Sequence, residues 1–93
     1  MEFKMRIAVL SAYSIRNISE FIPTDCTEIL TNVPNLRDVH AHTHISYSSD
    51  VKALIEASDH VMILCPRGTR RMPSFLALCR RLCRSFEIVM IDP

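Results

Sequence analysis

Residues 61–72 read VMILCPRGTRRM, and this stretch decides the fold. Its first five residues are apolar, which predicts a buried strand, and an amphipathic run over residues 72–86 predicts a long helix. Between the two lies Gly68, the single glycine in 93 residues. A loop that joins a strand to a helix N-terminus favours anions, because free backbone N–H groups and the helix dipole point at the ligand. A dinucleotide fingerprint or a P-loop needs several glycines, so the sequence excludes both.

The remaining segments predict an open α/β sheet. Residues 6–10 form a near-continuous apolar run, typical of a central parallel strand covered on both faces. Residues 28–31 and 87–91 predict further strands, and residues 15–22 predict a short helix. Residues 51–58 predict a helix for which Ser48-Ser49-Asp50 offers an N-cap and whose inward face is Val51, Leu54, Ile55 and Ser58. Alternation of strand and helix predicts a small three-layer Rossmann-like domain over residues 1–93. Its mainly parallel sheet would have four to five strands, with residues 6–10 in the middle.

Residues 39–45 alternate between apolar and polar positions, which predicts an edge strand with one wet face. Seven residues separate them from the strand at 28–31, whereas a parallel crossover needs about a dozen. The pair is therefore expected to form a hairpin, unless a compact loop makes the return. The wet face carries His40, His42 and His44, and neighbouring histidines on a strand can share a zinc ion. A solvent-facing edge strand explains them without a metal, so no metal site is assigned.

Charge is distributed unevenly along the chain. Residues 67–84 hold six arginines and no acidic residue, whereas the rest holds five basic and ten acidic residues. This asymmetry indicates an anionic ligand, nucleic acid, an acidic partner or simply a solvated helix face. The buried stripe predicted for the helix is Met72, Phe75, Leu76, Cys79, Leu82, Cys83 and Phe86, with Arg80, Arg81 and Arg84 off it.

The start of the chain lacks the apolar stretch and cleavage site of a signal peptide, and no apolar run approaches the roughly 18 residues of a membrane span. We therefore expect a cytoplasmic protein without membrane contact, whose four cysteines are reduced. No Cys-x-x-Cys motif is present, and core packing is the expected role of the cysteines.

Four stretches resemble small bacterial Rossmann-like proteins of the SLOG superfamily, which includes DNA-processing and LOG-type phosphoribohydrolase branches. They are residues 6–10 (RIAVL), 22–30 (IPTDCTEIL), 53–62 (ALIEASDHVM) and 67–69 (RGT). The chain departs from the family pattern at residues 11–13, where members carry Gly-Ser-Arg, and at residues 32–34, where members carry Gly-Gly-Ala. The Pro-Gly-Gly-x-Gly-Thr context of the LOG-type enzymes is absent. The resemblance thus implies the fold and one nucleotide-binding loop, and it argues against the enzyme.

The leading hypothesis is a non-catalytic binding or sensing module for a nucleotide-like or other phosphate-bearing ligand, or a relic of one. Its predicted binding residues are Arg67, Gly68, Thr69, Arg70 and Arg71, flanked by Ser11, Tyr13 and Ser14. An inherited turn with surface arginines is the plainer interpretation of the same loop. One alternative function is a small interaction protein that uses its arginine-rich helix on nucleic acid or an acidic partner. The other is a nucleotide-cleaving enzyme, which no recognisable carboxylate motif supports. No catalytic residue and no cofactor is assigned, and a homodimer is compatible with the sequence.

Overall fold

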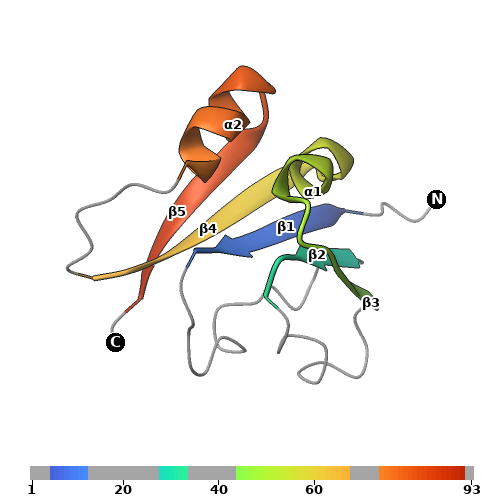
Figure 1. Cartoon of the computed structure of the whole chain (residues 1–93), viewed down its shortest axis with the longest axis horizontal. Helices are drawn as coiled ribbons and strands as arrows, with labels where there is room; N and C mark the ends of the chain where they lie inside the picture. Colours follow the sequence, from blue (N-terminus) through green and yellow to red (C-terminus); the bar gives the residue numbers. More distant parts are fainter. Residues whose placement is uncertain (1–4, 13–27, 34–43, 68–73, 92–93) are drawn as a thin grey trace.

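The computed structural model describes residues 5–12, 28–33, 44–67 and 74–91, in which the chain forms five strands and two helices. The strands are β1 (Arg6–Ser11), β2 (Glu28–Thr31), β3 (His44–Tyr47), β4 (His60–Pro66) and β5 (Ser85–Ile91), and the helices are α1 (Val51–Ala57) and α2 (Phe75–Arg81). All neighbouring strands run parallel, in the order β3-β2-β1-β4-β5 (Figure 1). The predicted Rossmann-like α/β arrangement is therefore confirmed, with β1 at the centre of the sheet.

Both faces of β1 are buried, as the apolar run at residues 6–10 predicts. The helices α1 and α2 lie on one face (Figure 1), where Leu54, Ile55, Leu76 and Cys79 pack on apolar side chains of β1, β2 and β4. The opposite face has its own cluster, whose buried members are Ile7, Val9, Ile29, Val33, Met62, Leu64 and Ile91. Successive residues of β1 therefore contribute alternately to the two clusters, as the two-residue repeat of a strand requires.

The strand β3 lies at an edge of the sheet, as predicted, but the expected hairpin with β2 is wrong. The two strands are parallel, with Glu28 opposite His44 and Thr31 opposite Tyr47. The described part of β3 begins at His44, and twelve residues lie between Thr31 and His44. That is about the length that a parallel crossover requires. Residues 39–43 lie outside the described ranges.

The helix α1 begins and ends close to its predicted bounds. Asp50 caps it by accepting a hydrogen bond from the Ala53 N–H at 3.2 Å. Leu54, Ile55 and Ser58 are buried, and Val51 is half-buried against the same cluster. The apolar spacing of the sequence therefore identified the correct inward face.

The helix α2 is shorter than the prediction of residues 72–86, because a backbone motif ends it. The Cys83 N–H donates to the Arg80 carbonyl at 3.2 Å, and the Arg84 N–H donates to the Cys79 carbonyl at 2.9 Å. Cys83 itself has φ 54°, in the left-handed region. These two bonds and the left-handed residue form a Schellman motif, with Cys83 in the place that glycine usually takes.

The early end of α2 changes the predicted buried stripe. Phe75, Leu76 and Cys79 are buried as expected, but Leu82 is only half-buried and Cys83 is exposed. Phe86 is not helical; it belongs to β5, opposite Val61 of β4. The strand β5 consequently begins two residues before the predicted one.

No helix among the described residues is long and apolar enough to cross a membrane. The segment at residues 15–22, for which a short helix is predicted, lies outside the described ranges, and so do Met72 and Pro73.

Candidate functional site

The predicted site lies where the parallel strands end. Consecutive strands are added on one side of β1 as far as β3, and the chain then crosses to the other side, where β4 and β5 lie. The strand order therefore reverses between β1 and β4, whose last paired residues include Ser11 and Leu64. In open α/β sheets, ligands bind in the crevice at the carboxyl ends of the strands at such a reversal point.

Arg67 follows β4 directly at this end of the sheet. Its backbone N–H donates to the Ile91 carbonyl at 2.8 Å, so the ladder between β4 and β5 continues into the first residue of the loop. The residue is exposed. Arg67 is thus the one member of the predicted arginine and glycine loop that the structure describes; Gly68, Thr69, Arg70 and Arg71 lie outside the described ranges.

Ser11 ends β1, and the side chain of Asn32 binds its backbone. The Ser11 N–H donates to Asn32 Oδ1, and Asn32 Nδ2 donates to the Ser11 carbonyl, both at 2.9 Å. The carboxamide of Asn32 therefore takes the place of the backbone N–H and C=O that one further residue of β2 would present to Ser11. Ser11 is also buried, with 6% of its surface exposed, so its backbone is engaged within the protein. Tyr13 and Ser14, the other predicted flanking residues, lie outside the described ranges.

Thr31, the last residue of β2, is buried and makes two hydrogen bonds through one hydroxyl. Its Oγ1 donates to the Val9 carbonyl at 2.8 Å and accepts from the Val33 N–H at 3.0 Å. A buried hydroxyl is stable only when it is hydrogen-bonded, and these two partners satisfy it. Thr31 therefore fixes the turn that carries Asn32 to Ser11.

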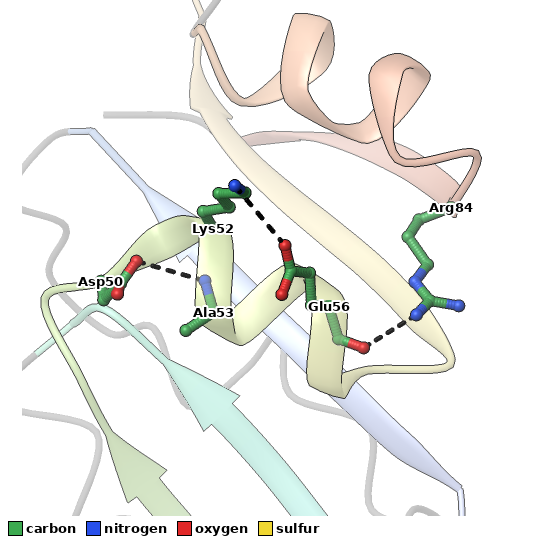
Figure 2. A network of polar contacts seen from close by, with 5 residues as sticks. All are labelled: Asp50, Lys52, Ala53, Glu56 and Arg84. Carbon is green, nitrogen blue, oxygen red and sulfur yellow. Dashed lines mark hydrogen bonds and ion pairs between the residues drawn. The ribbon is translucent and has the colours of Figure 1, made fainter.

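The N-terminus of α1 also lies at this end of the sheet, and acceptors of the chain itself occupy it. Ser48 Oγ accepts from the Asp50 N–H at 3.1 Å, and the Asp50 carboxylate accepts from Ala53 (Figure 2). A carboxylate already complements the positive end of the helix dipole, so this terminus does not favour a second anion.

The fold separates the described arginines of the basic block at residues 67–84. Because β4 and β5 are parallel, α2 returns the chain from the carboxyl to the amino end of the sheet. Arg67 therefore lies at one end, whereas Arg80, Arg81 and Arg84 lie toward the other and are exposed. Arg84 donates to the Glu56 carbonyl at 2.8 Å, and Glu56 Oε1 lies 3.9 Å from Lys52 Nζ (Figure 2). The four described arginines of the basic block thus lie on two separate surfaces.

A polar cluster that the sequence reasoning missed lies at the amino end of the sheet. His60 Nδ1 lies 2.8 Å from Ser85 Oγ, and His60 Nε2 lies 3.2 Å from Glu87 Oε1. The carboxylate favours the tautomer with hydrogen on Nε2, which leaves Nδ1 to accept from the serine hydroxyl. The signal for this cluster is the register, which pairs His60 with Ser85 and cannot be read from either strand alone.

Among the described residues, no group of three or more histidine, cysteine, aspartate or glutamate side chains is placed to hold a metal ion. Of the three histidines considered as ligands, only His44 falls in a described range, as the first residue of β3; His40 and His42 lie outside.

The cysteines of the described ranges are free thiols. Cys65 and Cys79 are buried and Cys83 is exposed. Burial raises the pKa of the Cys79 thiol, because desolvation disfavours the thiolate.

Comparison of the chain with known proteins finds no matching family model, no matching curated protein and no matching solved structure.

Proposed function

We propose that this protein is a non-catalytic binding module for a phosphate-bearing, nucleotide-like ligand, held at the carboxyl ends of β1 and β4. The observation that carries the proposal is the strand order β3-β2-β1-β4-β5, which reverses between these two strands, with exposed Arg67 directly after β4. A reversal point supplies a crevice, and a guanidinium group at its edge favours an anion.

The neighbouring backbone groups support a role for the loop after β4. Asn32 engages the backbone of Ser11, and Asp50 caps the N-terminus of α1. These two potential sources of N–H donors are therefore used within the protein. The anchored backbone of Arg67 precedes residues 68–71, for which the sequence predicts a loop with two more arginines and a threonine hydroxyl. We infer that this loop provides the charge and donors for the phosphate.

We also propose that the chain is a reduced member of the SLOG superfamily, with the bacterial origin and cytoplasmic location that this implies. The central β1, the parallel sheet and the sequence Arg67-Gly68-Thr69 after β4 support this assignment. The family's other glycine loops are replaced by Ser11-Ala12-Tyr13 and Asn32-Val33-Pro34, so weak binding is expected.

The test is isothermal titration of the full chain with inorganic phosphate and with adenosine monophosphate at low salt. We expect saturable binding that is reduced in Arg67→Gln and retained in Arg81→Gln, which removes an exposed arginine from α2. A ligand that binds only the folded state also raises the melting temperature, which provides a second readout. Absence of heat with both ligands, or equal loss in the two variants, would contradict the proposal.

A second candidate is an interaction surface for nucleic acid or an acidic partner. It rests on Arg80 and Arg81, at the end of α2, and on Arg84, which follows the Schellman motif; all three are exposed. Phosphate contacts by such arginines make binding strongly dependent on salt. Oligonucleotide binding that weakens in Arg81→Gln, but not in Arg67→Gln, would favour this candidate over the small-ligand site.

A further inference from the structure

The outermost strand β5 has one edge that no described strand covers (Figure 1). The hydrogen bond from Arg67 to the Ile91 carbonyl shows that the backbone of Ile91 faces β4. Backbone groups alternate in direction along a strand, so Ser85, Glu87 and Val89 face β4 as well. The N–H and C=O groups that point outward are therefore those of the remaining strand residues, Phe86, Ile88 and Met90.

The three outward positions are all apolar. The side chains of Ile88 and Met90 are large and exposed, at 37% and 50% of their surface, and Phe86 is half-buried. Edge strands that stay single usually carry a charge, a proline or a bulge at such positions, because an unprotected edge pairs with another chain. Phe86, Ile88 and Met90, whose backbone groups point outward, include no charged residue and no proline.

The opposite edge of the sheet is different. In its described part β3 has four residues, His44–Tyr47, whereas β5 has seven. A short edge offers few backbone groups for pairing. Among the described strands at the two edges, β5 therefore offers the longer row of unpaired backbone groups.

We propose that β5 pairs antiparallel with β5 of a second copy of this chain, about a two-fold axis at Ile88. In this register Ile88 lies opposite Ile88 of the second copy, and Phe86 lies opposite Met90 in both directions. All three outward residues then exchange their N–H and C=O groups with the other strand, which gives about six inter-strand hydrogen bonds. The two five-stranded sheets join into one continuous sheet. This inference does not depend on the proposed ligand site.

Charge selects this register over its neighbours. Glu87 is the single charged side chain of β5, and in the proposed register it lies opposite Val89 of the second copy. A shift that centres the axis on Glu87 would place two carboxylates directly opposite each other, which is destabilising. A shift that centres it on Val89 leaves Phe86 without a partner and loses about two of the hydrogen bonds.

The side chains of the proposed interface complement one another. Phe86 packs against the cluster under the helices, and the two-residue repeat places Ile88 and Met90 on the same face of β5. Pairing therefore aligns three apolar side chains of each copy in one row across the axis. Their removal from water adds a hydrophobic contribution to the backbone bonds.

The experiment uses sedimentation velocity on the full chain and on three variants, Ile88→Lys, Ile88→Glu and Tyr47→Lys. Wild type is expected to sediment as a dimer, at about twice the 10.7 kDa chain mass. Ile88→Lys and Ile88→Glu should each be monomeric, because like charges face each other across the axis. Tyr47 is an exposed residue of β3, so Tyr47→Lys should remain dimeric. Circular dichroism melts verify that each variant is folded.

An equimolar mixture of Ile88→Lys and Ile88→Glu tests the register itself. Lysine lies opposite glutamate only if position 88 of one copy faces position 88 of the other, so the mixture should regain the dimer. A monomeric wild type, a dimer that survives both Ile88 variants, or a mixture that stays monomeric would overturn the proposal.

Discussion

Asn32 and Ser11 are joined by two hydrogen bonds of 2.9 Å, in which one side-chain carboxamide satisfies both backbone groups of the other residue. The pair ties the turn after β2 to the end of β1, the central strand. It therefore holds the turn after β2 against the end of β1, on one side of the point where the strand order reverses.

Replacement of Asn32 by alanine removes both side-chain hydrogen bonds to the backbone of Ser11, a largely buried residue. We expect Asn32→Ala to lower the free energy of unfolding by about 1–3 kcal/mol, because each hydrogen bond contributes about 0.5–1.5 kcal/mol. Urea denaturation monitored by circular dichroism measures it. Lys52→Ala is the control, because its ion pair with Glu56 is exposed and contributes only about 0.5 kcal/mol or less. Equal free energies of unfolding for Asn32→Ala and Lys52→Ala would show that the two hydrogen bonds of the Asn32 carboxamide contribute little to stability.

The early end of α2 predicts unequal effects for two leucines. Leu76 is buried inside the helix, whereas Leu82 is a half-buried cap residue. Leu76→Ala should cost about 2–5 kcal/mol, and Leu82→Ala roughly 1–2 kcal/mol. Arg81→Ala, which removes an exposed side chain, should stay within about 0.5 kcal/mol of wild type. A larger loss for Leu82→Ala than for Leu76→Ala in chemical denaturation would indicate that the helix continues as the sequence pattern suggests.

Cys83 adopts φ 54°, which costs energy for any residue that carries a Cβ atom. Cys83→Gly should therefore raise the free energy of unfolding, by about 0.5–1 kcal/mol. Cys83→Ala removes the same thiol but retains Cβ, so it should give no such gain. If thermal and chemical denaturation give the two variants equal stability, the gain does not come from the left-handed backbone.

Elements that depend on a single periodic pattern could be predicted from the sequence. The apolar run at residues 6–10 identified the central strand, because such a run requires burial on both faces. Asp50 and the spacing of Leu54 and Ile55 identified α1, its cap and its inward face. These signals are local, so a single chain segment contains all the information.

Features that depend on two segments could not be predicted in the same way. The bridge from Asn32 to Ser11 and the contact of His60 with Ser85 exist only in the observed register. The end of α2 was missed because Cys83, and not glycine, occupies the left-handed position of the Schellman motif. Of the proposed phosphate loop, only Arg67 falls within the described ranges, so its role stays a prediction for the titration experiment.

The thiols of the described ranges should differ in reactivity. The thiolate is the reactive form of cysteine, and burial raises the pKa of Cys79, so this thiol stays protonated and shielded. Cys83 is exposed, so under native conditions it should react rapidly with a disulfide reagent such as dithionitrobenzoate. Cys83→Ser should remove one rapidly reacting thiol, whereas Cys79→Ser should leave the rapid phase unchanged. The reverse result would mean that the helix buries Cys83 and exposes Cys79, which is incompatible with the Schellman end of α2.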